Sequence, residues 1–396
     1  MPVNRNTLVG LLLGALSAGT AFAIDEAEQR ARIEFETRRF EESIEHSADL
    51  LNDPELNAYL QEVTDRMFPD MKGKLRVRTF REPNFNAFAV ATGGIYFHTG
   101  ALLRLQDEAQ LALVLGHEGT HVTADHMYRS IKSAKTTSVV TLIAGLAAAG
   151  YGIPPELVSI IGYSSMAGFS REHERESDRG GYERMIAAGY DARGAAEGFA
   201  RLERELRARN VTQGPYFFAS HPRVQERVAT LNELAGESPP PGERNEERYR
   251  AVTLRARMQA LSQLHRNGNG KVLVFLLEDE KLLDTLPVHA RFYLAEGFRL
   301  RAEKAKRDSR DKRSAEEIEA QRAADAARAI TEYERAIAEA PDFAPTWQAL
   351  ALHHYRAGDK PRALELFRRY VELEPDPKQS GYARQYVESL SKELGQ

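Results

Sequence analysis

The sequence predicts a mostly α-helical protein with one small β-sheet, followed by a short domain of helical repeats. Three observations lead to this prediction. Apolar residues recur at helical spacing through most of the 396 residues. Residues 75–80 instead alternate between apolar and polar side chains, as a strand does, and residues 86–98 have the pattern of a β-hairpin that turns at Gly93-Gly94. Beyond a proline-rich stretch, the pair Pro341-Asp342 recurs as Pro375-Asp376, at the 34-residue period of tetratricopeptide repeats.

The composition is that of an ordinary globular protein with little net charge. Lysine and arginine number 54 against 58 acidic residues, which gives a net charge of −4. Because there is no basic excess, nucleic acid is not expected as a partner. The chain also contains no cysteine. Its stability must therefore come from its core and from a bound metal rather than from disulfides.

The first 23 residues have the pattern of a secretory signal peptide. Arg5 supplies a positive charge, residues 8–16 are apolar, and residues 21–23 read Ala-Phe-Ala, a typical cleavage signal. We therefore expect export to the periplasm with cleavage after Ala23. The alternative is an uncleaved membrane anchor, but the apolar stretch is shorter than the roughly 20 residues that span a bilayer.

Residues 24–237 are predicted to form the first domain. Asp53 and Pro54 mark a helix start, as an N-cap followed by proline. The expected elements in chain order are helices over 25–51 and 54–68, strands over 75–80, 86–90 and 95–98, and helices over 107–126 and 171–189. Between the last two lies a weakly polar run, 138–169, broken by Pro154-Pro155. Its first part is shorter than the roughly 20 residues of a membrane span, so we interpret the run as a helical hairpin or lid, with peripheral membrane contact as the alternative.

The helix predicted over 107–126 carries the motif His-Glu-Gly-Thr-His. His117 and His121 are four residues apart, so they lie on one helix face and can share a metal ion. Glu118 lies beside them, where it can take a proton from an attacking water. Two buried structural histidines are the alternative. The apolar run 111–115 before the motif favours a buried metal site.

A hydrolytic zinc site needs a third protein ligand and keeps a fourth position open. In the charged segment 170–179, Glu174 and Asp178 share one helix face and fit a ligand and the hydrogen-bond partner of a ligand imidazole. Other residues of suitable type leave this choice open: Glu172, His173 and Glu176. Asp125 and His126 follow the motif too closely, and we interpret them as an extension of its helix.

These motifs resemble the gluzincin peptidases, the family that includes HtpX, the CAAX prenyl protease, the mitochondrial Oma-type proteases and BepA. The family pattern of H-E-x-x-H, followed further along by E-x-x-A/S-D, is matched by residues 117–121 and 174–178. Residues 85–89 and 94–96 look similar as well, and so does Ser-His-Pro at 220–222. The resemblance covers about residues 30–235. With the leader and the C-terminal repeats, the architecture is similar to that of BepA-like members.

The resemblance implies a periplasmic zinc metalloendopeptidase with one Zn²⁺ per chain. His117, His121 and Glu174 are its expected zinc ligands. Glu118 is the expected general base, and Asp178 the expected partner of a ligand histidine. Serine at position 177, where the family more often has alanine, should not disturb the zinc.

Two further residues are implied as catalytic. His221 is expected either to occupy the open zinc position and keep the enzyme latent, or to donate a hydrogen bond to the oxyanion. Capping of the helix that begins at Pro222 is the alternative role for His221. Arg227 is expected to help with the oxyanion or to brace its helix.

The C-terminal third is predicted to be a separate helical region. Residues 238–243, Ser-Pro-Pro-Pro-Gly-Glu, are interpreted as a linker. A connecting helical segment over 244–286 and a repeat domain over 287–396 follow. Residues 303–321 would be an insertion or a helix extension. The last repeat has tetratricopeptide-like offsets of its main residues: Trp347, Leu350, Ala363, Phe367 and Pro375.

The resemblance implies degradation of misfolded or stalled envelope proteins, in outer-membrane protein quality control. An extended substrate would lie along an edge strand of the sheet. Unfolded or partly assembled envelope proteins are the expected substrates, and the repeats are the expected contact with the outer-membrane assembly machinery. The alternatives are a chaperone or assembly factor that acts through its repeats with a latent peptidase site, and helical hairpins that merely cap the core.

Overall fold

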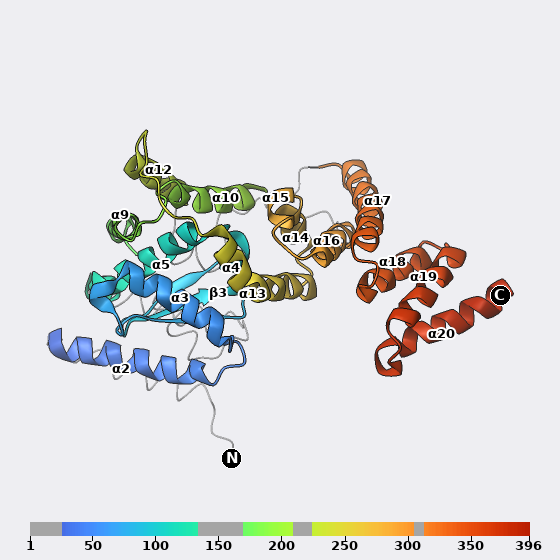
Figure 1. The fold of residues 1–396 in the computed structure, drawn as a ribbon, viewed down its shortest axis with the longest axis horizontal. Coiled ribbons are helices and arrows are strands. Elements are labelled where there is room, and N and C mark those ends of the chain that lie inside the picture. Colours follow the sequence, from blue (N-terminus) through green and yellow to red (C-terminus); the bar gives the residue numbers. More distant parts are fainter. Residues whose placement is uncertain (1–25, 134–168, 209–223, 305–312) are drawn as a thin grey trace, which may run out of the picture.

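The computed structural model describes residues 26–133, 169–208, 224–304 and 313–396. The predicted leader, most of the apolar run 138–169, and His221 lie outside these residues. Figure 1 shows an elongated molecule, with the β-sheet at one end and helices leading away to the C-terminus at the other. The predicted mostly α-helical fold with a small sheet is confirmed.

The three predicted strands form one sheet in the order β1-β3-β2. Strand β1 (Arg76–Phe80) pairs in parallel with β3 (Gly94–His98), while β2 (Ala87–Ala89) pairs with β3 antiparallel, as the predicted hairpin requires. Gly93 in the hairpin has a φ of 89°. Its missing side chain also matters, because a Cβ there would lie 2.4 Å from the Lys74 carbonyl oxygen.

Both faces of the sheet are covered, so that every residue of β3 is buried. On one face, Ile95 and Phe97 join the main core with helices α3 (Pro54–Met67) and α5 (Glu108–Thr123). On the other, helix α2 (Glu26–Glu45) closes a small aromatic-rich cluster. Its members are Phe40, Ile44, Phe80, Phe88, Val90 and Tyr96. The alternation along β3 thus separates two cores.

The predicted start of α3 is confirmed, since the Asp53 side chain accepts a hydrogen bond from the Leu56 amide and Pro54 follows it. The helix predicted over 107–126 is shorter than expected. It ends at Thr123, because Asp125 adopts a left-handed conformation with a φ of 55°. A new helix, α6 (His126–Ser133), starts directly after it. The interpretation of Asp125 and His126 as an extension of α5 was therefore wrong.

Helix α9 (Arg171–Ala187) carries the second predicted motif and packs along α5. The Ser170 hydroxyl caps its start by accepting from the His173 amide. The remaining helices, two of them short 3-10 turns, are η1 (Pro69–Met71), α4 (Thr99–Arg104), α10 (Gly194–Ala208), α12 (Val224–Ala235), α13 (Glu246–Arg266), α14 (Gly270–Leu277), α15 (Glu280–Leu283), η2 (Val288–Ala290), α16 (Arg291–Glu303), α17 (Ala315–Glu339), α18 (Ala344–Arg356), α19 (Lys360–Leu373) and α20 (Pro377–Leu394). No helix in the described part of the chain is long and apolar enough to cross a membrane.

The segment predicted as a linker, 238–243, lies against the first domain. The Ala192 amide donates to the Pro240 carbonyl, and the Glu243 amide donates to the Gly189 carbonyl. Helix α13 then joins two hydrophobic cores. Its Tyr249 lies in the main core, which packs against the sheet, and its Leu264 lies in a second core formed by the C-terminal helices. The predicted domain limits remain a prediction.

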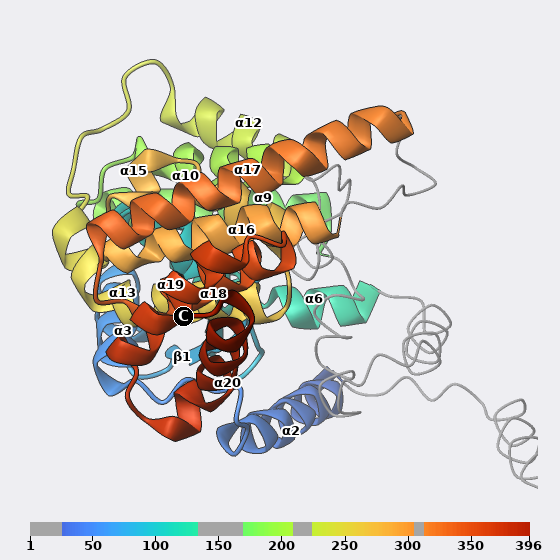
Figure 2. The same ribbon diagram turned by 90° about the vertical axis from the view of Figure 1, so that its right-hand side faces the viewer.

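The C-terminal region is built from helical hairpins. Helices α16 and α17 run side by side, as Figure 2 shows, and α18 pairs with α19, against which α20 packs. Three of the predicted repeat residues are fully buried: Leu350, Ala363 and Phe367. Within the predicted insertion 303–321, residues 315–321 are an N-terminal extension of α17. A tetratricopeptide assignment remains a prediction.

Candidate metal centre

Three predicted ligands come together between α5 and α9. The Nε2 atoms of His117 and His121 are 3.0 Å apart. Glu174 Oε2 lies 3.7 Å from His117 Nε2, and Glu174 Oε1 lies 3.6 Å from His121 Nε2. All three side chains are buried. Among the described residues, this is the one group of histidine and acidic side chains whose ligand atoms lie within 4.8 Å of one another.

The three side chains fit a divalent cation. Two imidazoles and one carboxylate are the ligand set of hydrolytic zinc sites that leave a fourth position open. Burial, and then the charge of Arg227, lower the pKa of His117 to about 4, so its ring is neutral and its Nε2 can offer a lone pair. Two other candidate ligands in α9 do not join this group. Glu172 is exposed, and His173 Nδ1 contacts the Ser130 hydroxyl.

Asp178 lies behind His117. Its Oδ1 is 2.9 Å from His117 Nδ1, which places His117 Nε2 on the side of the metal centre. Burial by itself would raise the pKa of the Asp178 carboxyl, but the charge of Arg227 and the hydrogen bond from His117 outweigh burial and lower the pKa to about 2. Asp178 is therefore a carboxylate at any pH near neutrality and accepts the His117 proton.

Arg227, on α12, is buried beside this carboxylate. Its Nε lies 3.0 Å from Asp178 Oδ1, and its Nη2 lies 2.7 Å from the same oxygen. Its Nη1 is 3.9 Å from Glu174 Oε2, and its guanidinium stacks 4.2 Å from the ring centre of Phe199. These contacts join α12 to α9, and the predicted role of Arg227 remains a prediction.

Glu118 lies on α5 next to His117 and is buried. Since α5 is buried at every position from Glu108 to His121, the motif sits inside the domain rather than on a surface helix. His221 falls outside the described residues, so its predicted role stays a prediction.

Sequence reasoning missed His126. Its ring is buried at the start of α6, and its Nδ1 lies 3.0 Å from Nδ1 of His121. Helical spacing could not have found it, because the left-handed turn at Asp125 changes the direction of the chain between the two histidines. A histidine five residues after the motif, at the start of a separate helix, was the available signal.

Gly116 on α5 and Gly181 on α9 face each other and allow the two helices to come close enough to share a metal. A Cβ on Gly181 would lie 2.8 Å from the His117 amide nitrogen and 3.0 Å from the Gly116 carbonyl carbon. Both neighbours are backbone atoms, so a side chain at position 181 could fit only if the two helices moved apart. The close crossing therefore sets the distance between Glu174 and the two histidines.

Replacing Gly181 by alanine should lower both stability and zinc affinity. Overpacking of this kind costs about 1–3 kcal/mol, and the shift of α9 draws Glu174 away from the histidines. Thermal unfolding of the metal-free chain and a zinc titration check the two effects. Gly381→Ala is the matched control, since Gly381 is also helical but a Cβ there would meet nothing within 4 Å. The control should gain up to about 1 kcal/mol, and equal behaviour of the two variants would contradict the prediction.

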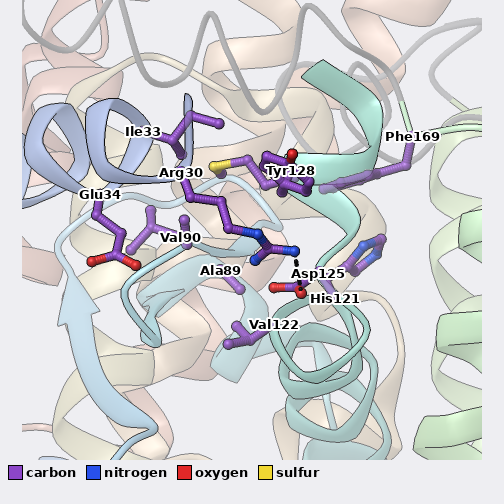
Figure 3. A pocket seen from close by; sticks show the side chains of 12 residues that line it. Arg30, Ile33, Glu34, Ala89, Val90, His121, Val122, Asp125, Tyr128 and Phe169 are labelled. Atoms are coloured by element: carbon purple, nitrogen blue, oxygen red, sulfur yellow. Dashed lines mark hydrogen bonds and ion pairs between the residues drawn. The ribbon is translucent and has the colours of Figure 1, made fainter. Parts of the chain in front are cut away.

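A pocket lies beside His121, between α2, the end of β2 and α5 (Figure 3). It is lined by Arg30, Ile33, Glu34, Ala89, Val90, Ala91, His121, Val122, Asp125, Met127, Tyr128 and Phe169. The Arg30 guanidinium reaches across it and pairs with Asp125 at 3.0 Å, as the dashed line in Figure 3 shows. The same guanidinium lies 4.0 Å from the ring centre of Tyr128. The predicted metal centre thus borders a groove next to an edge strand.

Comparisons with known proteins agree with this geometry. Residues 51–235 match the model of peptidase family M48. The chain is 31% identical over 209 residues to a Vibrio cholerae serotype O1 protein provisionally named a beta-barrel assembly-enhancing protease, covering 50% of this chain and 43% of that protein. It is 27% identical over 206 residues to the beta-barrel assembly-enhancing protease of Escherichia coli (strain K12), covering 49% of this chain and 42% of that protein. Mitochondrial metalloendopeptidase OMA1 of Schizosaccharomyces pombe is 29% identical over 170 residues, covering 43% of this chain and 48% of that protein.

The chain spans less than half the length of each of these relatives. The matched residues 51–235 include both motif helices, α5 and α9, and the arginine that contacts Asp178. The resemblance to gluzincin peptidases stated from the motifs is confirmed. Residues 51–235 therefore match a domain of peptidase family M48, and the three side chains that converge lie within them.

Proposed function

We propose that the chain is a zinc endopeptidase that cuts unfolded or partly assembled proteins in the periplasm, as part of outer-membrane protein quality control. One observation carries the proposal. The ligand atoms of His117, His121 and Glu174 converge in the interior of the protein, directly beside Glu118. Bound zinc would supply Lewis-acid polarisation of the scissile carbonyl and a lowered pKa of water.

The chain's own residues perform the rest of the chemistry. Glu118 takes a proton from the attacking water and passes it to the leaving amine. Asp178 accepts the Nδ1 proton of His117 and thereby keeps its Nε2 turned toward the centre. Arg227 holds the Asp178 carboxylate through two nitrogens, so this arrangement is rigid before a substrate arrives.

An extended segment of substrate lies along the free edge of β2. Among the described strands, β2 is paired on one side only, with β3, and its end at Ala89 lines the groove beside His121. Main-chain hydrogen bonds to an edge strand bind any sequence, so cleavage has loose specificity and favours unfolded chains. A folded protein keeps most such segments buried or paired.

The setting in the envelope rests on two supports. The first 23 residues have the pattern of a signal peptide. Two relatives carry names that refer to β-barrel assembly. The helical hairpins from α16 to α20 then supply a surface for the client or for the outer-membrane assembly machinery, separate from the metal centre.

The proposal is tested by metal content and by cleavage of casein, which is an unfolded protein. The purified exported chain should contain one zinc ion, and cleavage should stop when a chelator removes the zinc. Adding one equivalent of zinc should restore cleavage. A chain that contains no zinc, or whose cleavage does not depend on the metal, would show that the proposal is wrong.

A further inference from the structure

His126 touches the metal centre although it lies outside the H-E-x-x-H motif. Its Nδ1 is 3.0 Å from Nδ1 of His121, and its Nε2 is 3.0 Å from Oε2 of Glu176. The rings of the two histidines meet edge to face, with centroids 4.9 Å apart and planes inclined by 77°. The His126 side chain is fully buried, while Glu176 is 43% exposed. His126 therefore links a predicted metal ligand to a carboxylate at the surface.

The contacts assign a proton to each imidazole. Nε2 of His121 faces His117 and Glu174, so it is the nitrogen whose lone pair points to the metal centre. The His121 proton must then be on Nδ1, where Nδ1 of His126 accepts it. The His126 proton is consequently on Nε2, which donates to the Glu176 carboxylate. In this series of hydrogen bonds, each N–H group points away from the metal centre.

His126 is held firmly enough to orient a neighbour. Its ring stacks on His173, with centroids 4.4 Å apart and planes within 15°. The Ser177 hydroxyl lies 3.2 Å from His126 Nδ1 and can share the lone pair of that nitrogen. Arg129 donates to the same oxygen of Glu176 that accepts from His126, at 2.9 Å. Contacts from α5 and α9 thus fix the ring.

We propose that His126 is a positioning residue for the metal ligand His121, as Asp178 is for His117. This inference rests on the proposed zinc site. His126 fixes the tautomer and the ring orientation of His121, so that Nε2 is ready to bind before the metal arrives. The two ligand histidines differ in consequence: His117 donates to a buried carboxylate, whereas His121 donates to an imidazole that passes the interaction on to Glu176.

Two amide substitutions separate this role from simple packing. The Oδ1 of asparagine reaches the place of His126 Nδ1 and can still accept from His121, whereas the amide of glutamine reaches the place of Nε2, near Glu176. Loss of such a partner typically weakens metal binding about 10–100-fold. In the full exported chain, His126→Asn should therefore stay within a few-fold of wild-type zinc affinity. His126→Gln should lose about 10–100-fold.

Zinc affinity is measured by competition with a chromophoric chelator, and thermal unfolding of the metal-free chain checks that each variant folds. Glu176→Ala is a second variant that folding does not limit, since its side chain is partly exposed. It should weaken zinc binding by less than the glutamine variant, because water can replace the carboxylate. Glu172→Ala, an exposed change in the same helix, should have no effect.

Equal zinc affinities of the asparagine and glutamine variants would overturn the positioning role, because packing alone would not distinguish the two amides. Unchanged affinity in both Glu176→Ala and His126→Gln would overturn it as well. These results are distinguishable from failure of the proposed function. In that case the wild-type chain itself would bind no zinc, and both the site and the inference would be wrong.

Discussion

Glu118→Gln should abolish cleavage of casein while the chain keeps its zinc. Glutamine has the shape of glutamate but cannot accept the proton of the attacking water. General-base catalysis contributes about 10²–10⁴-fold to rates of this kind, so cleavage should fall by at least that range. Because Glu118 is not among the three side chains whose ligand atoms converge, metal binding should not change. Casein cleavage and zinc content, measured on the same preparation, check both halves.

The matched control is Glu172→Gln, which makes the same chemical change on the exposed face of α9. It should leave both cleavage and zinc content at wild-type values. Retained cleavage in Glu118→Gln would mean that another residue is the base. Loss of zinc together with cleavage would mean that Glu118 helps to hold the metal, and the division of roles among these residues would have to change.

Glu174→Ala should remove both zinc and cleavage. Two imidazoles cannot hold zinc as tightly as two imidazoles and a carboxylate, and the loss should exceed the roughly 10–100-fold that follows from losing an indirect partner. Zinc should raise the unfolding free energy of the wild-type chain by about 2.7 kcal/mol when its free concentration is a hundred times the dissociation constant. The variant should show no such increase.

This second prediction is checked by thermal unfolding with and without zinc. Glu172→Ala, two residues earlier in the same helix, is the control and should keep the zinc-dependent increase. If Glu174→Ala kept full zinc affinity, the third ligand would have to come from another residue, and the geometry in which Glu174 lies within 3.7 Å of both imidazoles would have no function.

Local sequence was enough to predict the parts of the site that lie within one element. The spacing of His117 and His121 places both rings on one face of α5, because the helical repeat alone brings residues four apart together. The same holds for Glu174 and Asp178 on α9. The helix start at Asp53-Pro54 and the hairpin around Gly93 were also predicted correctly, since capping and turn residues act over a few positions.

Choices between distant elements could not be made from the residues alone. Glu172, Glu174 and Glu176 are chemically equivalent in sequence, and only the packing of α9 on α5 turns Glu174 toward the histidines. That packing depends on Gly181, whose lack of a side chain has no local signature. The parallel pairing of β1 with β3 was likewise not predictable, because the partner of a strand is set by the fold.

The sequence by itself determined the fold class, the two motifs and the family resemblance, all of which depend on periodicity and spacing within single elements. Only the tertiary structure decided that His126 contacts His121, that Arg227 holds Asp178, and that α13 joins both cores. The physical reason is the range of the interactions. Helical periodicity acts over four residues, whereas contacts such as these depend on a turn at Asp125 and on helices that are far apart in the chain.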